Sequence, residues 1–275
     1  MIEKIKPLLV KLLFPVFYLI SIIQHKMFPI QIRTDLETIE SLSKGMSVSR
    51  LGDLEFYLIL GRHGLSTQDM DNAISGRLQE ILSLDTEKTN GFMIALAHGF
   101  GNYNDQNFRE ISFWSWYNAR YRNKIYPYLN SKVYLNAHFA RNFKKQEEVV
   151  RAMKEIWRDK QVLLVEGEKI KFGLHTNILD NAKSIKRIIA PAKNAWSCYN
   201  DIVNAVKKHE KNHLILIILG ATATVLAYDL WAEGYHAIDF GQGIFWMEHE
   251  QTGTLLSEDD YCKQIVAVIK LNKGD

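Results

Sequence analysis

One short stretch of the chain carries the residue types best suited to chemistry. Ser49–Phe56 places one cation, one glycine and two carboxylates between apolar runs. Asp53 and Glu55, two residues apart, suit a hard divalent cation such as Mg²⁺ or Mn²⁺, which prefers oxygen ligands. Arg50 is suited to holding a phosphate group. The stretch therefore predicts a site for a metal ion and a phosphate.

The same acidic pair has a plainer interpretation. Asp53 is a good N-cap for a helix that begins at Leu54, and Glu55 in the first turn complements the helix dipole. Arg50 would then pair with either carboxylate. Spacing alone favours this cap interpretation, because short acidic pairs are common at helix starts.

Two further polar turns follow apolar runs. Glu166 and Glu168 flank a glycine, and Lys169 comes next. Gly220–Thr224 offers backbone N–H groups and two hydroxyls, which make an anion site, although it lacks the lysine of a P-loop and the dinucleotide fingerprint. A solvated turn and an ordinary N-cap threonine are the alternatives. With Ser49–Phe56, these turns have the groups needed to break a sugar–nucleotide bond, with Glu168 as the first choice of general base and Glu166 or Asp239 as substitutes.

Alternating strands and helices would position these turns. Apolar runs predict strands at 46–48, 92–97, 133–135, 161–165, 187–190, 213–219 and 236–239. Helices are predicted at 35–42, 56–60, 69–84, 146–158, 194–208, 225–233 and 258–271. This alternation predicts an α/β fold with a Rossmann-like, doubly wound, mostly parallel sheet and helices on both faces. Such sheets bind ligands at the carboxyl ends of their strands.

Composition excludes some classes of function. The net charge of +3 over 275 residues gives no case for a nucleic-acid partner, which requires a concentrated basic face. Cys198 and Cys262 are far apart and have no metal-ligand spacing. They fit a reducing compartment, where a free cysteine behaves as a small apolar residue.

Residues 1–30 form a separate apolar segment ahead of a predicted domain at 31–275. Pro7–Ile23 is nearly all apolar, lysines flank or interrupt it, and no small-residue cleavage site follows. The run is short for a membrane span, and Pro15 would kink it. We expect an interfacial helix that holds the protein at the inner, cytoplasmic face of the cell membrane. A marginal transmembrane anchor and a helix packed on the protein's own core are the alternatives.

The chain resembles the bacterial glycosyltransferases of the GT-D fold, a family first catalogued as a domain of unknown function. The likeness covers roughly residues 35–270. It rests on three blocks, namely Ser49–Phe56, Val165–Lys169 continuing to Asp180–Ile189, and Leu219–Leu230 continuing to Gly234–Asp239.

The resemblance implies a nucleotide-sugar donor, usually a UDP-sugar, and a divalent metal held with the help of Asp53 and Glu55. It thereby reverses the preference for the cap interpretation. We expect a metal-dependent glycosyltransferase that moves a hexose to a cell-surface glycan or a lipid-linked saccharide. The expected catalytic residues are Asp53, Glu55 and Glu168. The expected donor-binding residues are Arg50, Gly52, Lys169, Gly220, Thr222 and Thr224.

Two departures from the family pattern keep other functions open. Ala221 stands where the family usually has proline, and Gln242 stands where members often show a histidine. The second departure favours an alternative, a nucleotide-sugar-binding protein of the same fold with weak or lost catalysis. A phosphoesterase that uses the same metal site is a third hypothesis.

Overall fold

The computed structural model describes residues 2–103, 106–139, 146–174, 176–241 and 257–271. Its strands are β1 (Gln31–Ile32), β2 (Ser47–Leu51), β3 (Phe92–Leu96), β4 (Val133–Asn136), β5 (Gln161–Gly167), β6 (Ser184–Ala190), β7 (Leu214–Ile218), β8 (His236–Asp239) and β9 (Ile265–Val268). They form one sheet in the order β1-β4-β3-β2-β8-β7-β5-β6-β9. Every pairing between these described strands is parallel, so the predicted α/β fold is confirmed.

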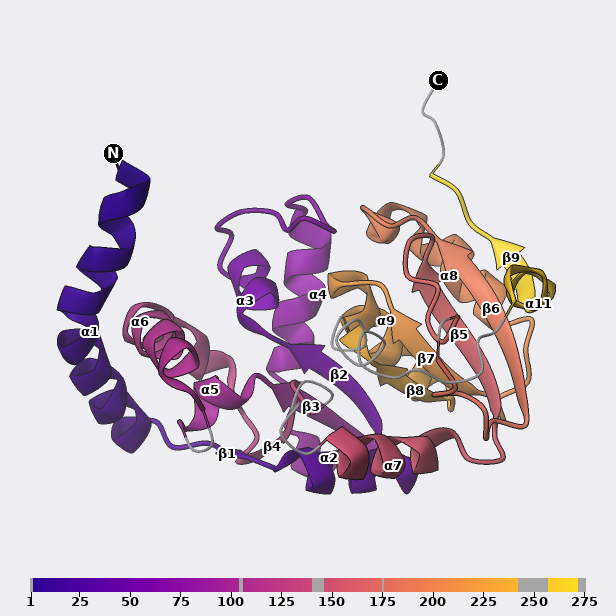
Figure 1. Cartoon of the computed structure of the whole chain (residues 1–275), viewed down its shortest axis with the longest axis horizontal. Helices are drawn as coiled ribbons and strands as arrows, with labels where there is room; N and C mark the ends of the chain where they lie inside the picture. Colours follow the sequence, from indigo (N-terminus) through magenta and orange to yellow (C-terminus); the bar gives the residue numbers. More distant parts are fainter. Residues whose placement is uncertain (1, 104–105, 140–145, 175, 242–256, 272–275) are drawn as a thin grey trace.

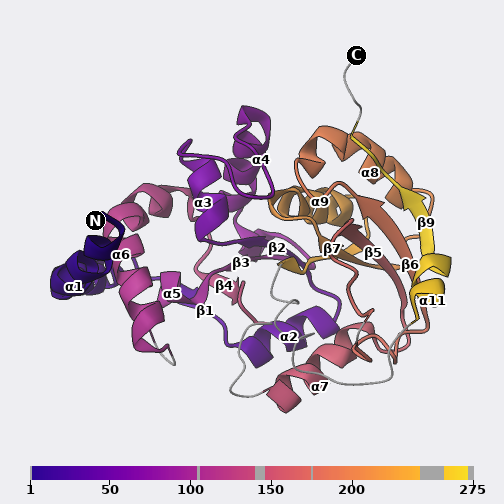
Figure 2. The same ribbon diagram turned by 45° about the horizontal axis from the view of Figure 1, so that its top comes forward.

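Helices cover both faces of this sheet. They are α1 (Ile2–Met27), α2 (Asp35–Ser43), α3 (Asp53–Ile59), α4 (Asn72–Leu82), α5 (His98–Gly101), α6 (Phe108–Ile125), α7 (Gln146–Trp157), α8 (Tyr199–Val206), α9 (Ala221–Ala232) and α11 (Glu258–Lys263). Figures 1 and 2 show α2 and α7 on one face and α3, α4, α8 and α9 on the other. The central strands are therefore buried on both sides, and all five residues of β2, β3 and β7 are buried.

The strand order places a topological switch point at the middle of the sheet. Strands β1–β4 make one half and β5–β9 the other, and the halves meet where β2 lies beside β8. From β2 the chain proceeds outward through β3 and β4, whereas β7 and β8 approach from the opposite side. Ligands of open α/β sheets bind at such a point, beyond the carboxyl ends of the strands.

The predicted helix at 258–271 is wrong in its second half. Helix α11 ends at Lys263, and Ile265–Val268 forms the edge strand β9 beside β6. The β-branched residues of this segment favour a strand, and the edge of β6 supplies its hydrogen-bonding partner. Arg187 N donates to the Gln264 carbonyl at 2.7 Å at the start of this pairing.

Four helix starts also differ from the prediction, and α3 begins three residues earlier and α4 three residues later than expected. Asn194 does not cap a helix with its side chain, since it has a left-handed backbone and precedes a 3₁₀ turn at Ala195–Cys198. Helix α8 begins only after that turn. Helix α9 begins at Ala221, four residues before the predicted start.

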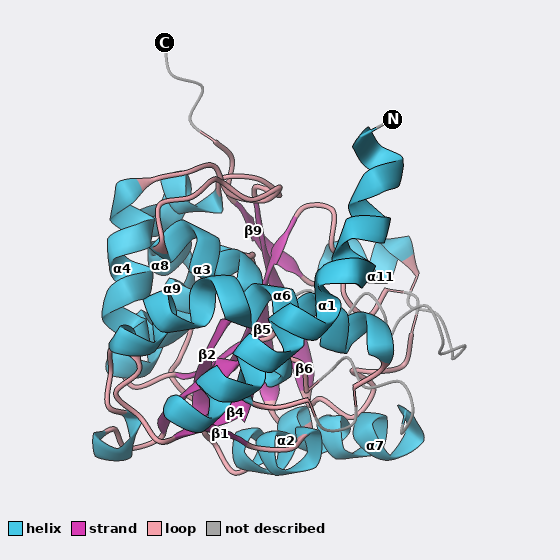
Figure 3. Ribbon diagram, turned by 90° about the vertical axis from the view of Figure 1, so that its left-hand side faces the viewer, coloured by secondary structure: helices cyan, strands magenta, loops and turns pink. Residues whose placement is uncertain are grey.

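The N-terminal segment is a 26-residue helix, α1, that continues through Pro15. Its second half lies along α6, as Figure 3 shows. His25 Nε2 lies 3.3 Å from Asn118 Nδ2, and Arg122 donates to the Phe28 carbonyl just after the helix, at 2.6 Å. This part of the helix thus packs on the protein itself, which was the third expectation for it. In the described chain, no helix combines the length and apolar character that crossing a membrane requires.

Candidate functional site

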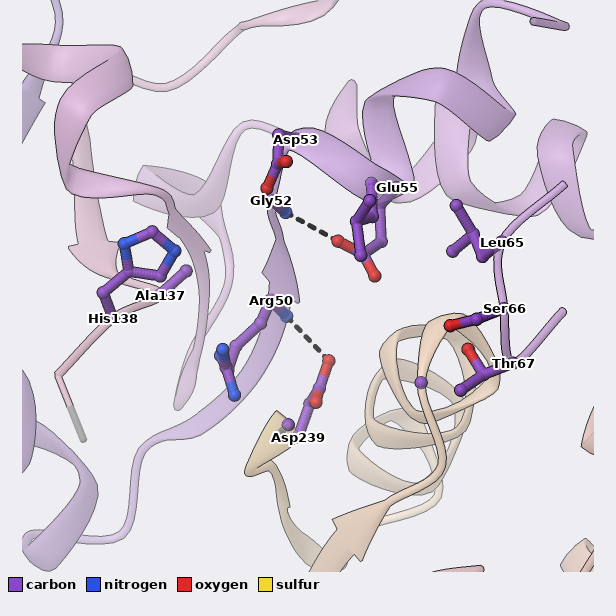
Figure 4. A pocket seen from close by; sticks show the side chains of 13 residues that line it. Arg50, Gly52, Asp53, Glu55, Leu65, Ser66, Thr67, Ala137, His138 and Asp239 are labelled. Carbon is purple, nitrogen blue, oxygen red and sulfur yellow. Dashed lines mark hydrogen bonds between the residues drawn. The ribbon is translucent and has the colours of Figure 1, made fainter. Parts of the chain in front are cut away.

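A pocket lies at the switch point, over the carboxyl ends of β2 and β8 (Figure 4). It is assembled from the end of β2 with the start of α3, the α3–α4 loop, the segment after β4, the turn before α9 and the end of β8. Its lining residues are Arg50, Gly52, Asp53, Leu54, Glu55, Leu65, Ser66, Thr67, Ala137, His138, Gly220, Asp239 and Gly241. The structure therefore brings the predicted site residues Arg50, Gly52, Asp53, Glu55 and Gly220 together in one pocket.

The acidic pair sits on the first turn of α3, and Glu55 caps that helix. Gly52 is the N-cap residue, and its N–H donates to Glu55 Oε2 at 2.8 Å. Asp53 is the first helical residue rather than the cap that the plainer interpretation expected. A carboxylate has several acceptor positions, so one bond to Gly52 leaves Glu55 able to bind a cation as well. The cap and the metal interpretations are thus compatible.

Burial raises the pKa of Glu55 above its usual value, and the neighbouring Asp53 charge raises it further. A cation held between the two carboxylates would act in the opposite direction, because an opposite charge favours the ionised form. The electrostatics of this turn therefore favour a positively charged ligand.

The donor set of the pocket determines which metal ion it can hold. Two carboxylates from one helical turn line the pocket. Over the described ranges, no group of three or more His, Cys, Asp and Glu side chains has metal-binding geometry. A pair of carboxylates fits Mg²⁺ or Mn²⁺ when substrate phosphates and water complete the coordination. Asp53 and Glu55 are therefore suitable ligands for a metal that arrives with a phosphorylated substrate.

Asp239 is the third carboxyl group of the pocket, at the end of β8. Its Oδ2 accepts a hydrogen bond from Arg50 N at 3.1 Å and lies 3.0 Å from Thr224 Oγ1. Burial raises the pKa of Asp239 to about 7, although the Arg50 charge and these bonds oppose the increase. A carboxyl group with a pKa near neutrality is suited to accepting a proton in catalysis.

Arg50 is held in the wall of the pocket by the segment after β8. Its Nη1 donates to the Phe240 carbonyl, and its guanidinium carbon lies 5.9 Å from the centre of the Phe139 ring. Gly241 has φ +56°, and a Cβ at this position would collide with Arg50 Nη1. Glycine is therefore needed at 241 both for its backbone conformation and for the space that the guanidinium occupies.

The turn before α9 supplies a helix N-terminus to the pocket. Gly220 has φ +53° and caps α9 without a side-chain hydrogen bond. Thr222 and Thr224 lie within α9 rather than in the predicted loop, are almost fully buried and do not line the pocket. Thr224 Oγ1 lies 2.9 Å from the Arg50 carbonyl, whereas Thr222 Oγ1 has no hydrogen-bond partner among the described residues. Their roles in donor binding stay predictions.

Glu168 and Lys169 are not among the residues that line the pocket. They are exposed in the turn after β5, where Glu168 N donates to the Ala190 carbonyl at 2.9 Å. Glu166 is fully buried, and its Oε1 contacts Arg187 Nη1 at 2.8 Å and the Tyr261 hydroxyl at 2.9 Å. Of the three candidate bases, only Asp239 lies in the pocket.

Sequence reasoning did not assign a site role to two lining segments. His138 follows strand β4, so the strand-end rule that selected the other turns would have selected it too. Leu65–Thr67 comes from a connection between two helices, and no pattern in it pointed to the site. Gln242, the residue that departs from the family pattern, lies outside the described residues.

Comparisons with known proteins agree on one family. The family model for the glycosyltransferase GT-D fold matches residues 48–250. The chain is 36% identical over 217 residues to a "probable glycosyl transferase Gly" of Streptococcus gordonii. It is 27% identical over 231 residues to "glycosyltransferase GlyD" of Streptococcus pneumoniae serotype 4. These matches cover 73% and 77% of this chain but only 30% and 26% of the relatives' lengths.

Two solved structures share the fold along most of the chain. One, described as a new glycosyltransferase (DUF1792) from Streptococcus sanguinis, is 31% identical with a TM-score of 0.78 and covers 88% of this chain and 100% of its own. The other is described as a highly conserved domain of unknown function with a distinct glycosyltransferase fold. It is 29% identical with a TM-score of 0.80, over 90% of this chain and 98% of its own.

Proposed function

We propose, from the premise that this chain belongs to the GT-D fold glycosyltransferase family, that it transfers a hexose from a UDP-sugar with the help of Mn²⁺ or Mg²⁺. The acceptor is a cell-surface glycan or a lipid-linked saccharide. The observation that carries the proposal is the pocket at the switch point. It combines the carboxylates of Asp53 and Glu55, the cation of Arg50 and the N-terminus of α9.

Each group has a role in breaking the bond between sugar and diphosphate. Asp53 and Glu55 would hold the metal, which stabilises the negative charge of the departing diphosphate. The first-turn N–H groups of α9 and the helix dipole favour the same anion. Arg50, held by the Phe240 carbonyl, adds a fixed positive charge at the pocket wall.

Asp239 is the base that the geometry supports best. It lies in the pocket, and its pKa of about 7 lets it take the proton of an acceptor hydroxyl near neutral pH. Glu168 was the first choice from the sequence and lies outside the pocket lining. Replacing each by its amide compares them directly: the Asp239 variant loses transfer, and the Glu168 variant keeps it.

A membrane surface is the proposed location of the acceptor. One face of α1 leaves a line of apolar side chains exposed, at Leu12, Val16, Leu19, Ile23 and Met27. These residues recur every three or four positions, as on one side of a helix. Lys26 is exposed beside them and suits an anionic headgroup. This face supports binding to the cytoplasmic side of the membrane, where lipid-linked saccharides are within reach.

The direct test is an assay of the purified protein with a panel of nucleotide sugars, with Mn²⁺, with Mg²⁺ and with a chelator. We expect one donor, with UDP as its nucleotide, to raise the melting temperature and to be transferred or slowly hydrolysed only when metal is present. Tight binding with no turnover under any condition would instead support the alternative of a nucleotide-sugar-binding protein. Binding of none of the donors would overturn the proposal.

A further inference from the structure

The connection between α3 and α4 forms a short strap, Leu65–Asp69, that lies against the start of α9. Ser66 and Thr67 line the pocket, and Figure 4 shows both side chains beside the first turn of the helix. A Cβ added to Gly220 would lie 2.7 Å from Thr67 Oγ1, so the strap contacts the turn directly. Two hydroxyl groups are thereby placed next to the N–H groups of a helix N-terminus.

The strap is closed on itself. Leu65 N donates to the Gln68 carbonyl, and Gln68 is buried beneath the loop. Gly64 and Met70 bring its two ends together, because a Cβ on Gly64 would lie only 2.7 Å from Met70 N. The strap is therefore a compact loop, and its contacts with the rest of the chain fix its place beside α9.

Asn194 holds the strap with three hydrogen bonds. Its own N–H donates to the Thr67 carbonyl at 2.8 Å. Its side-chain Oδ1 accepts from Asp69 N at 2.8 Å, and its Nδ2 donates to Asp69 Oδ2 at 2.7 Å. Asn194 has φ +56°, a left-handed conformation that asparagine tolerates better than most residues. The amide both donates and accepts here, which neither a carboxylate nor an aliphatic side chain can do.

We propose that Asn194 is a positioning residue for the donor: by clasping the strap, it holds the hydroxyls of Ser66 and Thr67 where they bind the donor's diphosphate at the N-terminus of α9. The inference rests on the proposed function of this pocket. A strap fixed before the ligand arrives costs less ordering entropy on binding, so the clasp acts through donor affinity.

The test exchanges the two partners of the clasp. Asn194→Asp keeps the tolerance for a left-handed backbone but replaces the Nδ2 bond to Asp69 by a contact between two carboxylates, beside Lys193 Nζ at 2.8 Å from Asp69 Oδ1, so the hold on the strap is weakened. The double variant, which adds Asp69→Asn, again pairs one amide with one carboxylate. The amide is then at position 69 and the carboxylate at position 194. The matched control is Asn212→Asp, because the Asn212 amide also donates to a carboxylate, that of Glu210, at 3.1 Å on the exposed surface.

The readouts are the Kd for UDP, measured by calorimetry with and without Mn²⁺, and the KM and kcat for hydrolysis of the donor. We expect Asn194→Asp to raise Kd and KM about tenfold with little change in kcat, as the loss of one or two positioning hydrogen bonds predicts. The double variant should return both constants to near the wild-type values, and Asn212→Asp should leave them unchanged. A purely structural role would lower the melting temperature and the active fraction without changing the Kd of the folded protein.

Several results would overturn the inference. One is a wild-type affinity for UDP in Asn194→Asp, and another is a folded double variant whose affinity for UDP stays low. If Asn194→Asp does not fold, Asn194→Gly replaces it, because glycine keeps the backbone conformation and removes only the side-chain bonds; unchanged affinity there also refutes the clasp. A wild-type protein that binds no nucleotide sugar refutes the proposed function itself, and the inference with it.

Discussion

Glu55 combines two tasks in one carboxylate, and they can be separated by substitution. It accepts the Gly52 N–H as part of a helix cap and also lines the pocket beside Asp53. In Glu55→Gln the amide oxygen still accepts that hydrogen bond, but the charge is gone. We predict that Glu55→Gln and Asp53→Asn each lower transfer by at least about tenfold, since a metal contributes several kcal/mol to leaving-group stabilisation. Steady-state transfer assays at saturating metal measure the effect.

A second capping box provides the control for this substitution. On α6, Asn107 N donates to Glu110 Oε2 at 2.9 Å in the same arrangement, and Glu110 does not line the pocket. Glu110→Gln should therefore leave transfer unchanged. If Glu55→Gln keeps full activity and only its melting temperature falls, Glu55 serves as a cap and the metal lies elsewhere.

Asp239 makes the stability of the fold depend on pH. Its pKa of about 7 in the folded chain exceeds the ordinary value of 3.8, so the folded state binds the proton more tightly than the unfolded state does. Stability from this group is therefore greatest below about pH 4 and declines as the pH rises toward 7. Asp239→Asn cannot ionise. We predict that the melting temperature of the variant, relative to wild type, increases from about pH 4 to about pH 7 and then levels off, and a constant difference would contradict the assignment.

The same substitution tests catalysis separately. A general base contributes on the order of 10²–10⁴-fold to a rate, so Asp239→Asn should lose at least about a hundredfold in kcat at pH 8. UDP binding should persist, because the amide oxygen introduced by the substitution can still accept from Arg50 N. Retention of transfer by the variant would show that Asp239 positions the backbone and another group takes the proton.

Single residues of the site were predictable from sequence where one short pattern contains them or where they end or follow a predicted strand, as Asp239 and Gly220 do. Asp53 and Glu55 are two positions apart on the first turn of α3, and Arg50 lies just before them at the end of β2, so one pattern contained all three. Ser66 and Thr67 reach the pocket because their loop folds back over Gly220, a contact between positions more than 150 residues apart. Only the tertiary structure brings them to the site.

The segment that follows β8 contacts the Arg50 side chain on β2, and a pair of glycine substitutions tests the importance of this contact. Gly241→Ala would place a methyl group where Arg50 Nη1 lies, while Gly61→Ala at φ +62° meets nothing within 4 Å. Both substitutions strain a left-handed backbone by about 1–2 kcal/mol. We predict that only Gly241→Ala weakens UDP binding, by about tenfold or more, because only there must the guanidinium move. Calorimetric titration of the two variants measures the difference, and equal losses would assign the effect to backbone strain.

Elements whose burial follows their sequence pattern were predicted well. The apolar run that became β7 is buried over its whole length, as a central parallel strand requires. The segment 265–268 was predicted as part of the helix at 258–271, which starts after the capping residue Ser257. Its strand conformation depends on β6 offering a free edge, which is a property of the assembled sheet. The early start of α9 likewise depends on the conformation of Gly220, which only the fold reveals.

At the scale of the whole molecule, α1 presents its exposed apolar face away from α6. Replacing Leu12, Val16, Leu19 and Ile23 by serine removes most of that face without touching the contacts of His25 and Phe28. We predict that the variant no longer sediments with vesicles containing anionic lipid, whereas the wild type does, because interfacial binding scales with the apolar area buried. Sedimentation assays over a range of lipid concentrations measure the change.

Two exposed valines on the edge strand provide the control. Val266 and Val268 are 45% and 56% exposed, comparable to Val16 and Ile23, but lie at the other end of the sheet. Their replacement by serine should leave sedimentation unchanged. Unchanged sedimentation of the α1 variant would exclude this face as the membrane contact. Truncation at Gln31 is a less specific test, because it would also expose the part of α6 that α1 covers.

The arrangement of the sheet in two halves has a consequence for synthesis on the ribosome. Strand β2 is made before β8, its neighbour across the switch point, which follows about 190 residues later. At ~5–20 residues per second, β2 waits about 10–40 seconds for this partner. During that interval one edge of β2 has no strand beside it, and Arg50 lacks both Asp239 and the Phe240 carbonyl. Binding competence therefore arises only after β8 has been synthesised, and a nascent chain released before β8 would expose an apolar edge that favours aggregation.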